Sequence, residues 1–175
     1  MPSPATPLPP SAAELAAVGA DCRAFLQGAD AVMIASRGGD AEPHISYAPV
    51  ICDAACHLWL LLSDLADHSA NLRAHGRGEV MLIEPAAAAR NPFARQRVTL
   101  RCRVTEIGRG DPAFAEQLEA MRRRHGETVT LLAGLGDFRL LRLQPEEGRY
   151  VQGFGRAWAL QATPAGLRVS GRVAR

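Results

Sequence analysis

Apolar and polar residues alternate most regularly between residues 97 and 104, which read RVTLRCRV. Arg97, Thr99, Arg101 and Arg103 fall on one face of this segment, and Val98, Leu100, Cys102 and Val104 fall on the other. A period of two residues predicts a strand with one face in a core and the other face exposed. Three partners would explain the exposed row of arginines: ordinary solvent, another subunit or an anionic ligand.

Other short apolar or alternating runs predict the rest of a sheet. We expect strands at residues 31–36, 43–52, 57–62, 79–84, 137–143 and 149–152, with a turn in GFGRAW at 153–158. Residues 57–62 are apolar on both faces, which is typical of a central strand in a sheet or barrel. The glycines of Gly153-Phe154-Gly155 indicate a bend that a ring or a second backbone approaches closely.

Apolar residues at helical spacing predict helices at 11–27, at about 67–74, from 111 to 126 and at 127–135. Ser11 and Glu14 suit a capping box at the start of the first helix. Asp111 and Pro112 combine a cap residue with a proline at the first helical position. Strands with inserted helices indicate an α+β, mainly β fold, and we expect a single antiparallel barrel domain at 11–175.

The composition narrows the range of partners. The formal charge is +2, which gives no strong reason to expect nucleic acid or an anionic membrane as a partner. All 20 basic residues are arginine, so the chain has no lysine for a Schiff base or a phosphate-binding loop. Residues 1–10 carry five prolines and no basic residue, which predicts a short disordered tail rather than a secretory signal. Because the longest aliphatic-aromatic run is far shorter than a bilayer span, we expect a cytoplasmic protein without a membrane segment.

The four cysteines form no CxxC pair. Cys52, Cys56 and His57 lie close together in the sequence, but a metal site needs at least one more well-placed ligand. Free cysteine behaves most often as a small core residue, so buried thiols beside a hairpin are the simpler interpretation. We therefore predict no metal site.

Two polar segments allow more than one interpretation. The tract 122–125 (RRRH) has the composition of a nucleic-acid patch, but it falls in the last turn of a predicted helix, where cations complement the helix dipole. The segment 63–69 joins a buried strand to a helix start, where free backbone N–H groups can bind phosphate. Capping by Ser63, Asp67 or Ser69 is the alternative, and the Asp67 carboxylate would repel a phosphate. No GxSxG, HExxH or P-loop pattern occurs, so catalytic residues stay unassigned.

Five segments, taken in order, resemble the haem-utilisation (HugZ/HutZ-type) branch of the pyridoxamine 5′-phosphate oxidase-like FMN-binding split-barrel superfamily. They are PHISYAPV (43–50), LLLSDLADHSANL (60–72), MLIEP with ARNPFARQRVTLRCRV (81–104), GDFRLLRL (136–143) and GFGRAW (153–158). The resemblance implies a six-stranded antiparallel split barrel with flanking helices. It also implies a homodimer, with cofactor sites in the two grooves between subunits.

In flavin-binding relatives, the strand that resembles 96–104 lines the groove and the junction that resembles 63–71 meets the FMN phosphate. In the haem branch, the same groove takes a haem. The resemblance therefore implies a set of cofactor-binding residues: Arg97, Thr99, Arg95, Ser63, His68, Ser69 and Tyr47. An arginine fork matches both phosphate and carboxylate geometry, so it suits FMN and haem propionates equally.

Two departures from the family pattern stand out. Flavin-binding oxidases carry an arginine or lysine pair at the helix start, where this chain has Asp67-His68-Ser69. Haem-degrading relatives use a histidine of the C-terminal tail as iron ligand, whereas residues 163–175 contain no histidine, cysteine, methionine or tyrosine. The resemblance implies FMN or haem binding with an oxidoreductase role, and the alternative is a non-catalytic protein that binds or stores haem or a flavin.

Overall fold

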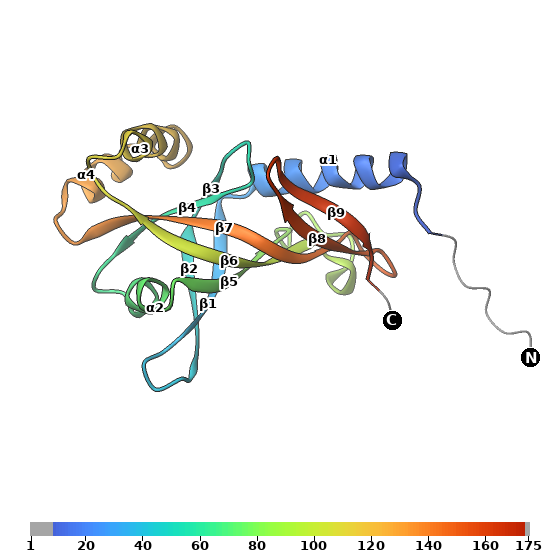
Figure 1. Ribbon diagram of the computed structural model, residues 1–175, viewed down its shortest axis with the longest axis horizontal. Helices are drawn as coiled ribbons and strands as arrows, with labels where there is room; N and C mark the ends of the chain where they lie inside the picture. The colour runs from blue at the N-terminus through green and yellow to red at the C-terminus, as the bar shows by residue number, and fades with distance from the viewer. Residues whose placement is uncertain (1–8, 174–175) are drawn as a thin grey trace, which may run out of the picture.

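The computed structural model describes residues 9–173, whose strands form one continuous antiparallel sheet (Figure 1). The helices are α1 (Ala12–Gly28), α2 (Asp67–His75), the 3-10 helix η1 (Pro92–Ala94), α3 (Pro112–His125) and α4 (Thr128–Gly134). The strands are β1 (Ala31–Arg37), β2 (Pro43–Pro49), β3 (Ile51–Cys52), β4 (Leu58–Ser63), β5 (Arg77–Ile83), β6 (Arg97–Ile107), β7 (Phe138–Val151), β8 (Ala157–Thr163) and β9 (Gly166–Arg172). Their order is β2-β1-β5-β6-β7-β4-β3, and the β8–β9 hairpin joins along β7.

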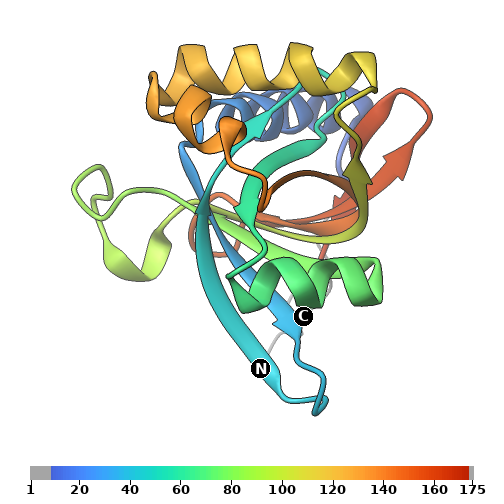
Figure 2. The ribbon, with the colours of Figure 1, turned by 90° about the vertical axis from the view of Figure 1, so that its left-hand side faces the viewer.

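The long strand β7 allows the sheet to curl. Its first half pairs with β4 and its second half pairs with β8, while β6 runs beside it along the whole length. The sheet therefore splits and bends into the half-barrel seen in Figure 2, with α3 and α4 above it and α2 below it. The predicted mainly β split barrel with flanking helices is confirmed.

The sequence pattern predicted seven strands and the resemblance implied a six-stranded barrel, whereas the described residues form nine strands. The predicted strand at 43–52 is interrupted near Val50, which divides it into β2 and β3. The predicted strands at 137–143 and 149–152 are one strand, β7. Residues 166–172, which the sequence pattern left as a tail, form β9 and pair with β8.

The main core lies on the inner face of the sheet. Val98, Leu100 and Cys102 are completely buried there, as their alternation predicted. They pack with apolar residues of the neighbouring strands and with α1 and α2, among them Leu26, Leu72, Leu82, Tyr150 and Trp158. Burial of this apolar surface is the main favourable contribution to folding.

A second core covers the other face of the sheet near β4. Trp59 and Leu61 of β4 pack there against Phe114 and Met121 of α3 and against α4. Because Leu58, Leu60 and Leu62 enter the main core instead, β4 is buried on both faces, as predicted for a central strand. The expected helix caps are also present: the Ser11 side chain accepts a hydrogen bond from the Glu14 N–H, and Asp111 caps α3.

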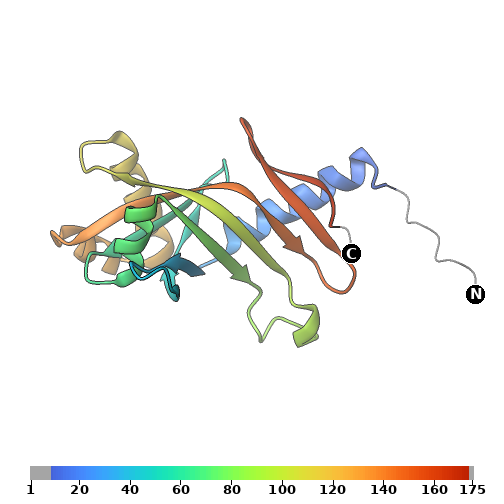
Figure 3. The ribbon, with the colours of Figure 1, turned by 60° about the horizontal axis from the view of Figure 1, so that its bottom comes forward.

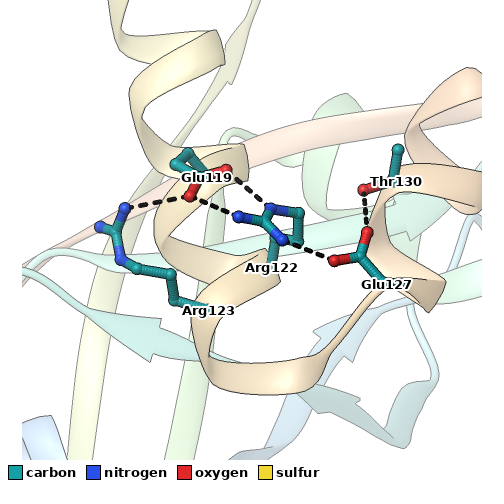
Figure 4. Close-up of polar contacts among 5 residues, drawn as sticks. All are labelled: Glu119, Arg122, Arg123, Glu127 and Thr130. Atoms are coloured by element: carbon teal, nitrogen blue, oxygen red, sulfur yellow. Dashed lines mark hydrogen bonds and ion pairs between the residues drawn. The ribbon is translucent and has the colours of Figure 1, made fainter.

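The basic tract at the end of α3 is held by acidic neighbours (Figure 4). Arg122 donates to Glu119 at 2.8 Å and also contacts Glu127, and Arg123 lies 3.3 Å from Glu119. Arg124 reaches across to Asp30 at 2.6 Å. These contacts give the tract the structural role that its position in the last helical turn indicated.

The predicted disordered tail at 1–10 lies outside the described residues, apart from Pro9 and Pro10. Within residues 9–173, none of the helices combines the length and the apolar character that a bilayer crossing requires. The turn after β7 has Gly153 and Gly155 at positive φ, and Gly153 lies close to the backbone of Ala94. This close approach agrees with the bend predicted for the turn.

Candidate functional site

A half-exposed row of side chains crosses the outer face of the sheet. Directly paired residues of five strands make up this row, which runs through Tyr47, Met33, Met81, Thr99 and Arg149. Beside it, Ile45 is 78% exposed, and Tyr47 itself is 66% exposed. An apolar hollow of about 230 Å³ lies between Met33, Ile45, Met81 and Thr99. The outer face thus offers apolar surface that water solvates poorly.

Arg97 lies next to this row and has a free guanidinium edge. Its cross-strand neighbours are Ile83 and Val151, neither of which is charged. Its Nη1 donates to the carbonyl oxygen of Arg95 at 3.0 Å, and among residues 9–173 it forms no ion pair. A half-buried arginine without an acidic partner is able to bind an anionic group.

Arg101 and Arg103, further along the same face of β6, are neutralised. Arg101 lies 2.6 Å from Glu147, and Arg103 lies 2.9 Å from Glu146. Glu147 lies directly opposite Arg101, and Glu146 is the extra residue of a bulge in the pairing between β6 and β7. The four polar residues predicted on one face of β6 therefore divide into two halves. Arg101 and Arg103 form the paired half, and Arg97 and Thr99 form the unpaired half.

Arg149 is a candidate residue that the sequence reasoning missed. It pairs directly with Thr99, so its side chain shares the outer face, and the described residues give it neither an ion pair nor a side-chain hydrogen bond. Arg149 and Thr99 border a hollow of about 430 Å³ together with Ala159 and Gln161. The sequence signal for Arg149 was the predicted strand at 149–152. The sequence alone did not show that this strand pairs with β6, so Arg149 was not placed on the outer face.

Arg95 has a different role from Arg97. Its guanidinium donates to the carbonyl oxygen of Glu84 through Nε at 2.9 Å and through Nη2. These bonds tie together the two ends of the loop between β5 and β6, which projects from the sheet in Figure 3. Arg95 therefore has fewer free donors for a ligand than Arg97.

The start of α2 keeps the backbone N–H groups of Asp67 and His68 free among the described residues, because those of Ala66 and Ser69 donate to carbonyl oxygens. Its N-cap is Ala66, which makes no side-chain capping bond, so the expected capping by Ser63, Asp67 or Ser69 was wrong. The Ser63 hydroxyl instead donates to Asp137 at 2.6 Å and accepts from the N–H of Leu65. An uncapped helix start offers N–H groups and partial positive charge to an anion.

Buried polar atoms without partners lie in the segments beneath this helix start. The Oγ atoms of Ser69 and Ser46 and the Nδ1 atom of His44 are buried and have no hydrogen-bond partner. Burial lowers the pKa of His68, and the neighbouring His44 lowers it further, against the opposing effect of Asp67. The imidazole of His68 is therefore neutral at pH 7, which is the form that binds a metal ion.

The structure separates the seven predicted residues into two groups. Thr99 and Tyr47 share the outer row, with Arg97 and Arg95 beside it, whereas His68 and Ser69 belong to α2, which packs on the main core through Leu72, and Ser63 ends β4. The outer row and the residues of α2 therefore lie on opposite faces of the sheet in one protomer.

The cysteine cluster offers few ligands for a metal ion. Within residues 9–173, no three His, Cys, Asp or Glu side chains are grouped closely enough to hold one. His57 is bound instead to Asp53, through Nδ1 at 3.1 Å. All four cysteines are free thiols.

Comparison with known proteins identifies the relatives of this chain. The family model described as pyridoxamine 5′-phosphate oxidase matches residues 18–152. The heme oxygenase HutZ of Vibrio cholerae is 32% identical over 138 residues, which cover 79% of this chain and 78% of that protein.

Two solved structures support the same relationship. The crystal structure of HutZ, described as the heme storage protein of Vibrio cholerae, superposes with a TM-score of 0.70 at 32% identity and covers 78% of this chain and 95% of that one. Campylobacter jejuni ChuZ superposes with a TM-score of 0.78 at 22% identity, over 91% of this chain and 66% of that one, and shows the shared fold. This chain belongs to the pyridoxamine 5′-phosphate oxidase family, in its HutZ-type branch.

Proposed function

We propose that the chain forms a homodimer that binds haem in a groove between its two protomers. The observation that carries this proposal is the unpaired half of β6, where Arg97 and Arg149 flank Thr99 beside an apolar row. A planar ligand with an apolar body and anionic side groups matches that combination. The heme oxygenase and heme storage descriptions of HutZ favour haem among such ligands.

The two separate groups of candidate residues support the proposed dimer. If the outer faces of two protomers pack together, the apolar surface of Ile45 and Tyr47 is removed from water. Arg97 of one protomer would then share a groove with the partner subunit's Ser69 and the partner subunit's His68. A two-fold axis would create two such grooves.

The residues present fit a haem in three respects. Arg97 and Arg149 are free to bind propionate groups, and the apolar row suits the face of the macrocycle. His68 would supply a neutral imidazole to the iron, since residues 163–175 offer no ligand. A bound haem would supply the redox chemistry, while the side chains bind and orient it.

FMN is the second candidate ligand. The uncapped start of α2 and the buried, unpartnered Ser69 hydroxyl favour a phosphate group there. The Asp67 carboxylate in the same turn opposes this, because its side chain is 83% exposed and would face the phosphate charge. Haem therefore remains the leading candidate.

Absorbance titrations distinguish these ligands. Haem added to the purified protein is expected to give a saturable, shifted Soret band, and the His68→Ala variant is expected to move the position of that band. Identical Soret bands in both proteins would exclude His68 as the ligand. If the Soret band does not shift in either protein but FMN fluorescence is quenched on binding, FMN replaces haem in the proposal.

Turnover distinguishes an oxidoreductase from a storage protein. The haem-loaded protein is given an electron donor in air and followed by its Soret band. Loss of the band with stoichiometric product indicates haem breakdown, and a stable band indicates storage.

Light scattering tests the dimer. Tyr47→Glu places a charge in the outer row and is expected to dissociate it. Leu131→Glu is the matched control, because Leu131 is 74% exposed on α4, away from that face. A monomeric wild type, or equal effects of both variants, would contradict the proposed interface.

A further inference from the structure

Three of the four cysteines converge beneath the β3–β4 hairpin. Cys22 of α1 and Cys56 of the hairpin turn are buried in the main core, and Cys52 of β3 packs against it. The fourth, Cys102, lies on β6 and is fully buried among other strands. Cys52 and Cys56 are only four residues apart, so their relation depends on the shape of the turn.

The turn holds Cys56 in an unusual backbone conformation. The Cys56 N–H donates to the Asp53 carbonyl at 3.0 Å, and the Asp53 N–H donates to the His57 carbonyl at 3.0 Å. This is a three-residue hairpin loop whose last position adopts the left-handed region and usually holds glycine. Cys56 occupies that position with φ of 64°. A non-glycine residue kept in this region is strained, which points to a role for its side chain.

The same hairpin aims both sulfur atoms to one side. The Asp53 carboxylate accepts hydrogen bonds from the His57 ring and from Nε1 of Trp59, so these three side chains share one face. Strand alternation then places Cys52 on the opposite face, where Cys56 is buried. There the Cys52 sulfur neighbours the Cys56 sulfur, while the Cys52 thiol donates to the carbonyl oxygen of Asp53 at 3.6 Å.

This contact makes the pair chemically different from the other thiols. The neighbouring Cys52 thiol lowers the pKa of Cys56 to about 7, although burial opposes the shift. The same contact raises the pKa of Cys52, and burial raises the pKa of Cys22 to about 12. The pair therefore shares one proton near neutral pH, and thiolate is the form that reacts with oxidants.

Small molecules can reach the pair from solvent. Cys52 is partly exposed and borders a hollow of about 340 Å³ between the end of α1 and α3. Arg123 and Arg124 line the same hollow, where they pair with Glu119 and Asp30, and the acidic residues Asp53 and Glu116 line it as well. Cys56 lies behind Cys52 and is 1% exposed.

We propose that Cys52 and Cys56 are a redox-sensitive pair, which a peroxide-class oxidant converts into a reversible disulfide within the hairpin. The thiolate of the pair attacks hydrogen peroxide, forms a sulfenic acid and releases hydroxide. The neighbouring thiol then attacks the sulfenic sulfur, so that the S–S bond forms and water leaves. In total, two thiols are oxidised and one peroxide is reduced to two waters.

Tryptic peptide mapping tests the disulfide directly. Cleavage after Arg37 and Arg73 releases peptide 38–73, which contains Cys52 and Cys56 and no other cysteine. After brief treatment of the folded protein with hydrogen peroxide, this peptide is expected to lose two hydrogens and to resist alkylation. Dithiothreitol is expected to restore both thiols. Two alkylated thiols in peptide 38–73, or a cross-link to the peptide that holds Cys22, would overturn the proposal.

Variants and pH separate the native pair from a chance reaction of two nearby thiols. Cys52→Ser and Cys56→Gly are each expected to abolish the disulfide. Cys56→Gly also suits the left-handed backbone, so it keeps the test valid if the Cys52→Ser protein does not fold. Cys102→Ala is the control and is expected to keep it. The oxidation rate of the folded protein is expected to rise with a midpoint near pH 7. A midpoint at about 8.5, the value of an ordinary thiol, would contradict the shared proton.

Discussion

The two halves of β6 differ in how their exposed arginines are neutralised. In the first half, Arg97 and Thr99 face Val151 and Arg149 on β7, so no acidic side chain lies opposite Arg97. In the second half, Arg101 and Arg103 each contact a glutamate. The residue pattern of both halves is the same alternation. The difference arises in the neighbouring strand.

The bulge in β7 explains this difference. It falls opposite the step from Arg101 to Cys102 and adds one residue to β7. The extra residue allows both Glu146 and Glu147 to reach the arginines of β6, and Glu146 also contacts Arg77 at 3.3 Å. A row of arginines on a strand is thus a candidate ligand site only where the partner strand leaves it unpaired.

The largest expected effect comes from the glycine at which the two halves meet. Gly148 pairs with Leu100, and a Cβ at this position would overlap the Thr99 carbonyl oxygen and the Leu100 side chain. Because backbone cannot move aside as a flexible side chain can, Gly148→Ala is expected to cost about 2–3 kcal/mol of unfolding free energy. Urea denaturation followed by circular dichroism measures this change.

Gly171→Ala is the matched control for this prediction. Gly171 also lies on a strand, but a Cβ there would meet nothing within 4 Å. We expect a change within about 0.5 kcal/mol, as for other substitutions without a steric cause. Equal destabilisation by the two alanines would show that β6 and β7 are not held closely at Gly148.

The next effect concerns ligand affinity and compares the two halves directly. Arg97→Ala removes the unpaired guanidinium and is expected to weaken haem or FMN binding by about 1.5–3 kcal/mol, the scale of a charged hydrogen bond. This corresponds to roughly 10- to 150-fold in Kd. Fluorescence or absorbance titration measures the change.

Arg101→Ala provides the comparison on the same strand and face. Arg101 is already paired with Glu147, so its loss is expected to change ligand affinity by less than about twofold. A loss for Arg101→Ala as large as that for Arg97→Ala would mean that net charge, rather than the unpaired half, governs binding. No change for either variant would make Arg97 an ordinary surface arginine.

The sequence predicted the fold well because local patterns determined most of it. The buried face at Val98, Leu100 and Cys102, the central strand β4 and the caps at Ser11 and Asp111 followed from periodicity and side-chain chemistry. Such features depend on neighbours along the chain. The family resemblance, carried by five ordered segments, was confirmed by the family match over residues 18–152.

The candidate site was harder to predict because it depends on which strands pair. Alternation placed Arg97, Arg101 and Arg103 on one face, but only the register with β7 separates the unpaired arginine from the paired ones. Arg149 was missed for the same reason. Capping at α2 was predicted from residue type, yet Ser63 bonds to Asp137, which lies 74 residues away in the sequence.

A smaller effect is expected when the paired half is made to resemble the unpaired half. Glu147→Gln removes the carboxylate beside Arg101 and leaves a second free guanidinium near Thr99. We expect anion affinity to rise by about twofold, since exposed ion pairs contribute up to about 1 kcal/mol. The gain should disappear in the double variant Glu147→Gln/Arg101→Ala. An unchanged or weaker affinity would show that ligand does not extend toward Arg101.

The smallest effect concerns the pH dependence of the paired half. The hydrogen bond from Arg103 lowers the pKa of Glu146 below its ordinary value of 4.5, and the charges of Arg77 and Arg101 lower it further. A carboxylate with a lowered folded-state pKa stabilises the fold above its unfolded-state pKa, and this contribution is lost as the pH falls through the lowered value. We therefore expect the wild type to lose more stability between about pH 5 and pH 3 than Glu146→Gln does.

Urea midpoints measured across this range at low and high salt test this expectation, because salt weakens exposed ion pairs. Asp64 and Glu119 also have lowered pKa values and contribute equally in both proteins, so only the difference between the two pH profiles reports on Glu146. Parallel profiles would mean that the glutamate placed by the bulge neutralises the arginines without stabilising the fold.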